Sequence, residues 1–341
     1  MKVYLDNNAT TAVDKRVLNA MKPYFCGTYG NPNSLHSYGT AANKAVREAL
    51  GTLYKLLRAD ENDTVLITSG STESNNTVIR GVYERTVRPR RAPLPASPAI
   101  TLPKVRPLFV TSAIEHPSVT EAFARIASDG CADVAVVQPR RDGSIYAEDV
   151  ARALDPRRTA LVSVMWANNE TGAINPVAAI ARAVHRAGGL FHTDATQAIG
   201  KVPLSGAVGA DFMSISAHKF HGPKGVGALY IRRGRPVRTM EPLLRGGEQM
   251  AGLRAGTINV PGVVGMARAA EIVMSKEGLV ALRRVRWLRD RLEDGILKGV
   301  PNAVVVSPDR EQRVPNTLLV AFPGVEGEAL IYGKYLSFHS I

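Results

Sequence analysis

Short apolar runs rich in β-branched residues alternate with longer amphipathic stretches through the first two thirds of the chain. The runs end in polar or glycine-containing turns, and six of them predict strands: Val65–Ile67, Leu108–Thr111, Ala160–Met165, Leu190–Thr193, Phe212–Ile215 and Gly227–Ile231. Helical periodicity predicts helices at Pro117–Ala127 and Pro176–Ala187. Strands alternating with helices are typical of a mostly parallel central sheet with flanking helices, so the sequence predicts an α/β fold.

The pattern changes near residue 255. Four apolar residues recur at helical spacing and predict one face of a long helix: Val285, Leu288, Leu292 and Ile296. A strand is expected after it, at Thr317–Ala321. We therefore expect a large domain over residues 1–255 and a smaller α+β domain over 256–341, with the N-terminal segment 1–30 belonging to or contacting the smaller one.

The segment 86–107 fits neither element. It holds six prolines between Val87 and Pro107, together with several arginines. Since proline lacks the backbone N–H that helices and central strands use, neither can run through this segment. We expect a surface loop, either an insertion without function or a regulatory element.

The bulk composition favours a globular protein without a membrane anchor. No apolar run in the 341 residues approaches the roughly 20 needed to cross a bilayer, and the N-terminus has no charged-then-apolar leader. A cytoplasmic location is expected. The two cysteines, Cys26 and Cys131, lie far apart without metal-type spacing, which argues against a disulfide framework or a metal site.

The net charge of +13 would suit an acidic partner. Arginines cluster in two places: Arg85, Arg88, Arg90 and Arg91, and again Arg283, Arg284, Arg286, Arg289 and Arg291. Neither cluster is interleaved with the aromatic residues expected of a single-strand nucleic-acid platform. Solvated faces are therefore favoured over an acidic protein or nucleic-acid partner.

The most informative segment is Ser214–Gly225, in which a predicted strand ends at Lys219 and leads into Gly222-Pro223-Lys224-Gly225. A lysine that forms an imine must be partly desolvated so that its amine is free near neutral pH, and a strand end suits this need. The alternatives are that Lys219 is a surface lysine, or that Lys224 takes the role. Lys224 follows a proline in a turn, which favours Lys219.

Asp194 and Gln197 follow another predicted strand. A carboxylate at a strand end is often a helix cap or a turn former. It also has a chemical use, because pyridoxal phosphate (PLP) withdraws electrons best when its pyridine nitrogen is protonated and paired with a buried carboxylate. Gln197 could then donate to the phenolate oxygen.

Three further motifs follow predicted strands. Thr68–Asn76 begins a helix with small hydroxyl residues, which suits a phosphate but also an ordinary Ser/Thr cap. Glu115-His116-Pro117 offers an imidazole that could stack on a cofactor ring and move protons, although a single histidine is more often structural. The third motif is Trp166–Gly172.

Together these residues resemble the NifS/IscS cysteine desulfurases, class V of the fold-type I PLP enzymes. The likeness also takes in four other segments: Tyr4–Thr11, Gly30–His36, Gly246–Gln249 and Arg254–Thr257. It implies that Lys219 forms the imine with PLP, that His116 stacks on the ring as a second catalytic residue, and that Asp194 pairs with the ring nitrogen. Its remaining implied contacts go to the phenolate oxygen and the phosphate: Asn169 and Gln197 to the former, Ser71, Thr72, Ser216 and His218 to the latter, and Thr257 to the phosphate of a neighbouring subunit.

The resemblance implies a homodimer that removes sulfur from L-cysteine, leaving alanine and a persulfide for a sulfur-acceptor or iron–sulfur scaffold protein. In the family, the motif matching Gly324–Leu330 precedes a loop with the nucleophilic cysteine and, later, a carboxylate-binding arginine. The chain ends at Ile341 without a counterpart of either, and neither Cys26 nor Cys131 maps onto that loop.

We therefore expect a C-terminally truncated desulfurase that binds PLP with weak or no turnover. Apolar faces such as that of Val285, Leu288 and Leu292 should then be partly uncovered. Two alternatives stay open: another class V enzyme, such as a selenocysteine lyase or aminotransferase, and a PLP-binding protein without desulfurase turnover.

Overall fold

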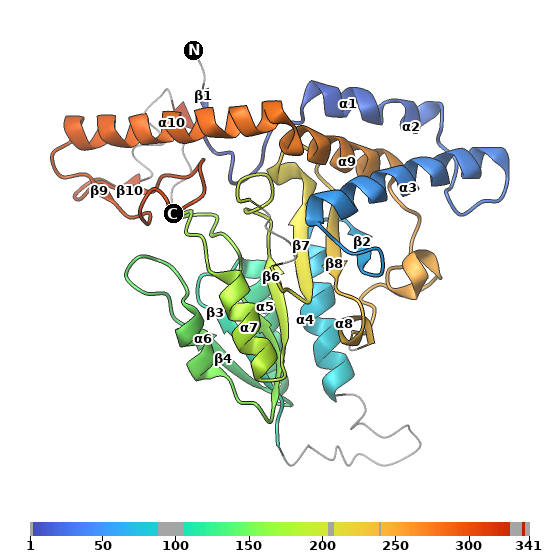
Figure 1. The fold of residues 1–341 in the computed structure, drawn as a ribbon, viewed down its shortest axis with the longest axis horizontal. Coiled ribbons are helices and arrows are strands. Elements are labelled where there is room, and N and C mark those ends of the chain that lie inside the picture. Colours follow the sequence, from blue (N-terminus) through green and yellow to red (C-terminus); the bar gives the residue numbers. More distant parts are fainter. Residues whose placement is uncertain (1–2, 88–104, 204–207, 239, 328–335, 338–341) are drawn as a thin grey trace.

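The computed structural model describes residues 3–87, 105–203, 208–238, 240–327 and 336–337 (Figure 1). Most of the predicted loop at 86–107, and most of the segment that follows the Gly324–Leu330 motif, therefore lie outside the described residues. Among those described, no helix is long and apolar enough to span a membrane, and no group of three His, Cys, Asp or Glu side chains could hold a metal ion.

The centre of the fold is a seven-stranded sheet with the order β2-β8-β7-β6-β5-β3-β4. Its strands are β2 Thr64–Thr68, β3 Leu108–Ser112, β4 Asp133–Val137, β5 Thr159–Ser163, β6 Leu190–Asp194, β7 Phe212–Ser216 and β8 Gly227–Ile231. The run from β4 to β7 is parallel, whereas β8 is antiparallel to both β7 and β2. The predicted α/β fold with a mostly parallel sheet is confirmed, and all six predicted strands are present.

Helices cover both faces of this sheet (Figure 1). They are α1 Lys15–Met21, α2 Pro23–Cys26, α3 Ser37–Leu57, α4 Ser71–Val87, α5 Pro117–Asp129, α6 Ala147–Ala153, α7 Val177–Arg186, α8 Arg235–Arg238, α9 Val260–Met274 and α10 Lys276–Gly299. Single 3₁₀ turns occur at Ala217–Lys219 (η2) and Gln249–Gly252 (η3).

The core follows the two-residue alternation of the strands. Phe109, Leu161 and Phe212 point to one face, where they pack with apolar residues of α4 and α5. Their neighbours Val110 and Val162 point to the other face, together with residues of α3, α7 and α9. Because both faces are buried, the strands read as continuous apolar runs, and this is why the sequence predicts them well.

The rest of the chain lies along one end of the sheet, at the top of Figure 1, where α10 extends beyond α9. Two small sheets lie beside it: β9 Val304–Val305 pairs antiparallel with β10 Val320–Ala321, and β1 Val3–Tyr4 pairs parallel with β11 Leu336–Ser337. The strand expected at Thr317–Ala321 is thus present but shorter.

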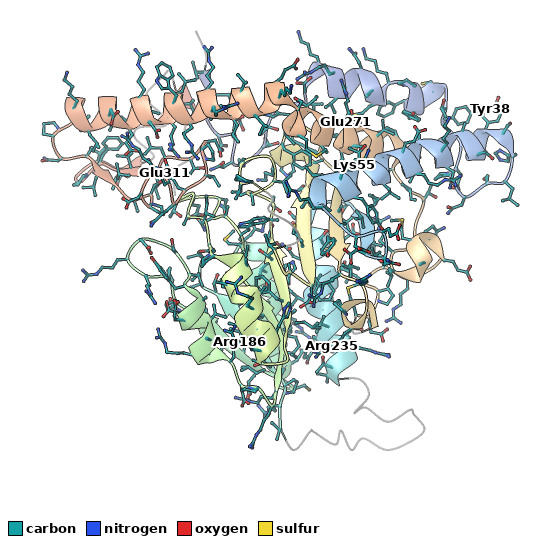
Figure 2. The ribbon with its side chains drawn as sticks, viewed as in Figure 1. Tyr38, Lys55, Arg186, Arg235, Glu271 and Glu311 are labelled. Atoms are coloured by element: carbon teal, nitrogen blue, oxygen red, sulfur yellow. The ribbon has the colours of Figure 1, made fainter. Side chains whose placement is uncertain are left out.

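The side chains of α10 are distributed unusually for a packed helix. Val285, Leu288 and Leu292 are 38%, 45% and 47% exposed, so the expected uncovered face is present. The buried positions of α10 are instead Arg289 and Glu293, which are paired with polar and charged partners. Figure 2 shows Glu311 near this helix and Tyr38 at the opposite, outer end of α3.

Candidate active site

The carboxyl ends of β2, β3, β5, β6 and β7 meet at one edge of the sheet, because these strands run in the same direction. A predicted site residue ends or follows each of them: Ser71, His116, Asn169, Asp194 and Lys219. This is the edge at which open α/β sheets bind their ligands. Residues separated by almost 150 positions in the sequence therefore lie around one place.

Asp194 is the last residue of β6 and is only 4% exposed. One carboxylate oxygen, Oδ2, accepts a hydrogen bond of 2.8 Å from Asn75 Nδ2, and the other, Oδ1, accepts one of 2.9 Å from the backbone N–H of Thr196. Neither partner is charged. The carboxylate is thus held in one orientation without being neutralised.

A hydrogen-bonded chain joins Asp194 to His116. The Nδ2 of Asn75 also donates to Ser118 Oγ over 2.9 Å, and that oxygen lies 2.9 Å from His116 Nδ1. The same ring nitrogen accepts from the backbone N–H of Ser118 over 3.1 Å, so His116 caps α5. Since Nδ1 is an acceptor, the neutral ring carries its proton on Nε2. His116 is therefore a helix cap whose ring orientation is fixed relative to Asp194.

Glu115 lies beside this chain and is buried. Its Oε1 accepts hydrogen bonds from Ser112 Oγ at 2.5 Å and from the backbone N–H of Met165 at 2.8 Å. Burial raises the pKa of Glu115 to about 8, against the effect of those two hydrogen bonds and with a further contribution from the charge of Asp194. The neutral form of Glu115 is thus favoured near pH 7, which limits the negative charge beside Asp194.

Lys219 closes the short η2 turn after β7. Its Nζ donates to the backbone oxygens of Asn8 at 2.5 Å and Ala9 at 2.8 Å. Burial lowers the pKa of this amine, whereas the negative charges of Asp194 and Asp6 act in the opposite direction. Lys224, the alternative candidate, is exposed. The geometry therefore favours Lys219 as the reactive lysine.

Gln197 and Lys201 extend the surroundings of Lys219. Gln197 Nε2 donates to the backbone oxygen of Asn8 over 2.9 Å, and Lys201 Nζ donates to Gln197 Oε1 over 2.5 Å. Burial, followed by the charge of Lys219, lowers the pKa of Lys201 to about 7. One amide hydrogen of Gln197 is thus committed to Asn8, which leaves the second for a ligand.

The first turn of α4 lies beside the start of β8 and the end of β7. A Cβ added at Gly227 would lie 2.7 Å from Gly70 Cα, and one added at Gly70 would lie 3.6 Å from Ser216 Oγ. This close approach brings the α4 N-terminus, with Ser71 and Thr72, next to Ser216. The N–H groups of a first helical turn have no partner within the helix, so they can bind an anion.

His218 adds a neutral donor to this region. Its Nδ1 lies 3.0 Å from Thr10 Oγ1, and burial, aided by the charges of Lys219, Lys224 and Lys201, lowers the pKa of the ring to about 4.

Asn169 and Thr257 are connected to the site through other groups: the backbone of Asn169 and the side chain of Arg254. Asn169 is half-buried, and its backbone oxygen accepts from Asn8 Nδ2 over 2.8 Å. Thr257 is exposed, on a segment that Arg254 ties to the first turn of α4 through a 2.9 Å ion pair with Glu73. A cavity of about 420 Å³ lies between α4 and α5; Ser118 lines it, but none of the predicted site residues does.

Sequence reasoning missed four residues of this arrangement: Asn8, Asn75, Ser118 and Lys201. The first three lie within or next to a motif that the sequence singled out, whereas Lys201 lies beyond one. Asn75 and Lys201 each stand four positions after a predicted site residue, Ser71 and Gln197. On a helix that spacing places two side chains on one face, so for Asn75 the signal was available.

Comparisons with known proteins find a matching family and similar named proteins. Residues 3–337 match the family described as aminotransferase class-V. A cysteine desulfurase of Cereibacter sphaeroides is 45% identical over 331 residues, which are 97% of this chain and 79% of the relative. The cysteine desulfurase NifS of Azotobacter vinelandii is 42% identical over 333 residues, covering 96% and 76%.

Solved structures give the same picture. A NifS-like protein superimposes with a TM-score of 0.85 at 40% identity, covering 97% of this chain and 84% of its own. A structure described as SspA in complex with cysteine superimposes with a TM-score of 0.78 at 30% identity, covering 94% and 84%.

Proposed function

The chain belongs to the class-V aminotransferase family, and from this premise we propose that it binds PLP at the carboxyl edge of its sheet and acts as a cysteine desulfurase. One observation carries the proposal. Asp194 and Lys219 follow neighbouring parallel strands, the first as a fixed buried carboxylate and the second as an amine whose pKa burial lowers. PLP chemistry requires a carboxylate that keeps the pyridine nitrogen protonated and a nearby amine that can form the imine.

The residues around Asp194 fit a polar aromatic ring. The two residues that bond its carboxylate each leave one buried oxygen without a hydrogen-bond partner, Asn75 Oδ1 and Thr196 Oγ1. Buried polar atoms are rarely left unpaired, because each costs about 1–3 kcal/mol. A polar ligand would relieve this cost, so the residues present fit the group that the family implies.

We assign the contacts as follows. Asp194 would hold a proton at the ring nitrogen, and Lys219 would attach the cofactor. His116, fixed as the α5 cap with its proton on Nε2, would cover the ring and move a proton at the substrate carbon. The polar groups of the ring substituents would be held by two sets: the phosphate by Ser71, Thr72, Ser216 and His218, the phenolate oxygen by Asn169 and Gln197.

Bound PLP would supply an electron sink for the substrate carbon. The protein would lower the cost of the reaction by orienting L-cysteine and excluding water from the sheet edge. Sulfur leaves when a thiolate attacks the substrate sulfur: a sulfur–sulfur bond forms and gives a persulfide, and the carbon–sulfur bond breaks. Its electron pair stays on the substrate carbon, which takes up a proton to give alanine.

The desulfurase reaction is favoured over the other class V activities because the relatives that match nearly the whole chain at 41–45% identity are named cysteine desulfurase. A structural neighbour is described as a complex with cysteine. The attacking thiol is a separate question. Cys131 is buried and Cys26 is exposed on α2. We propose a sulfur-acceptor or iron–sulfur scaffold protein as the recipient of the sulfur.

We include a homodimer in the proposal. Phe25, Tyr29, Leu35 and Tyr38 are 55–99% exposed around the α2–α3 turn, and a second copy would cover this apolar patch. Thr257 would then reach the phosphate of the partner subunit. Light scattering of the purified protein should give about twice 36.6 kDa; the mass of one chain would contradict this part.

The boundary near residue 255 stays a prediction. The packing of α9 against α1 fits the expected contact of the segment 1–30 with residues beyond 255, whereas α9 also packs against α3 and the core of the central sheet. We also propose a cytoplasmic location.

Absorbance tests the cofactor assignment. Purified protein incubated with PLP should acquire the visible absorption of lysine-bound PLP, and Lys219→Ala should lose it. Lys224→Ala is the matched control, because Lys224 is exposed in the following turn, and it should keep the absorption. A wild-type protein that stays colourless would refute PLP binding.

Product analysis tests the reaction. With L-cysteine and a reductant, PLP-loaded protein should release alanine and sulfide, in an amount that rises when an acceptor thiol is added. Alanine from selenocysteine but not from cysteine would assign the protein to another class V activity.

A further inference from the structure

Asn8 lies at the centre of the hydrogen bonds around Lys219, although it belongs to no helix or strand. Its side-chain Nδ2 donates to the backbone oxygen of Asn169 and to Thr317 Oγ1, both over 2.8 Å. Its Oδ1 accepts from Asn316 Nδ2 over 2.8 Å. Both amide hydrogens and the amide oxygen are thus engaged, which fixes the orientation of the side chain.

The backbone oxygen of Asn8 faces the reactive lysine. It accepts from Lys219 Nζ at 2.5 Å and from Gln197 Nε2 at 2.9 Å. A carbonyl oxygen has two lone pairs, so these two donors saturate it. Since Asn8 lies in a turn, the direction of this carbonyl depends on the hydrogen bonds that fix the Asn8 side chain.

Two partners of the Asn8 side chain, Asn316 and Thr317, belong to the C-terminal part of the chain. Residues 312–317 pair with the loop that carries Asn169, through Ile174 N–H to Gln312 O and Val314 N–H to Gly172 O, both at 2.9 Å. The same segment is tied to α10, because Arg313 pairs with Glu293. Asn8 therefore connects this segment with the amine of Lys219.

We propose that Asn8 is a positioning residue that transmits the placement of residues 312–317 to the amine of Lys219. The proposal rests on the assigned role of Lys219 and adds a control element to it. When Asn316 and Thr317 hold the Asn8 amide, the Asn8 carbonyl faces the lysine and stabilises its ammonium form. When they release it, the amine loses a fixed acceptor and its position.

The pH dependence of Lys219 acetylation tests this proposal without cofactor. Trace acetic anhydride labels free amines, and peptide mass spectrometry reports the labelling of Lys219 at each pH. Because a hydrogen bond to a charged group favours the charged form by about one pKa unit or more, Asn8→Ala should lower the apparent pKa of Lys219 by about one unit. The other charged groups near the amine, Asp194, Asp6 and Lys201, are kept in every variant.

The neighbouring asparagine provides the matched control. Asn7 Nδ2 makes a 3.4 Å contact with Tyr4 O, so Asn7→Ala should leave the titration of Lys219 unchanged. Equal shifts in Asn7→Ala and Asn8→Ala would overturn the proposal, since they would indicate a general loosening of the N-terminal segment.

Thr317 supplies the decisive variant, because it lies 309 positions from Asn8 and its hydroxyl accepts only one of the amide hydrogens. Thr317→Val should shift Lys219 in the same direction as Asn8→Ala, and Thr317→Ser should restore the wild-type value. The double variant should shift it no further than Asn8→Ala alone. An unshifted Thr317→Val or fully additive shifts would refute the coupling. Because no cofactor is used, a failure to bind PLP would be recognised separately by absorbance.

Discussion

Two regions of the proposed site are built in different ways. The acid region, made of Asp194, Asn75, Ser118 and His116, lies entirely on elements of the central sheet unit, and most of it is buried. The lysine region, made of Lys219, Gln197, Lys201 and Asn8, draws on the N-terminal turn and on residues 316–317 as well. The first inherits the rigidity of packed strands. The second depends on contacts between distant segments, so it can respond to their movement.

The largest expected effect lies in the acid region. Asp194→Asn keeps the shape of the side chain but removes the charge that would hold a proton at the cofactor ring. We expect alanine production from cysteine to fall by about 100-fold or more, the scale on which proton-transfer groups contribute. Steady-state alanine release measures this, with Asp14→Asn as a control at the half-buried N-cap of α1. Comparable turnover in Asp194→Asn would show that the acid region does not hold the ring.

The next effect concerns stability. Asn75→Ala removes the donor to Asp194 and leaves a buried carboxylate oxygen without that partner, which should lower the free energy of unfolding by about 1–3 kcal/mol. Asn76→Ala, one position along α4, removes donors to Thr72 O and Ser118 O and should cost less, since Asn76 is only half-buried. Urea denaturation compares the two variants. An equal loss of unfolding free energy in both variants would mean that Asn75 stabilises the acid region no more than Asn76 does.

The same contrast explains what the sequence could predict. The strands of the central sheet are continuous apolar runs, and residues at their carboxyl ends must converge once the sheet is parallel, so Asp194 and Lys219 could be placed together without a structure. β4 was not among the six predicted strands, although Val134–Val137 is a continuous apolar run. In the structure it is an edge strand, with half-buried positions and the exposed Val136.

The lysine region could be predicted only in part. Lys219 and Gln197 lie in motifs that indicate chemistry by themselves. The contacts of Asn8 with Asn316 and Thr317 join residues more than 300 positions apart, and neither composition nor periodicity carries that information. The buried ion pairs under α10 were missed for a related reason, since Arg289 reads as a member of a solvated basic cluster until its partners are known.

The smallest expected effect distinguishes the lysine region by its dependence on pH. Burial lowers the pKa of Lys201 from its ordinary value of 10.5 to about 7, so between these values the unfolded chain binds a proton that the folded chain binds less tightly. The folded state is thus penalised progressively as the pH falls from 10.5 to 7, and below 7 the penalty stays constant. Lys201→Met removes it, and because the side chain is only half-buried the gain at pH 7 should be about 1 kcal/mol.

Thermal unfolding at pH 7 and pH 9 measures this effect. The advantage of Lys201→Met over wild type should be smaller at pH 9, because releasing the amine proton on folding costs less free energy as the pH approaches 10.5. Lys224→Met, at an exposed lysine, should show no such dependence. A variant that is equally stable relative to wild type at both pH values would mean that Lys201 is hydrated in the folded protein. The lysine region would then be as open to solvent as its exposed neighbours, and its contrast with the buried acid region would be sharper.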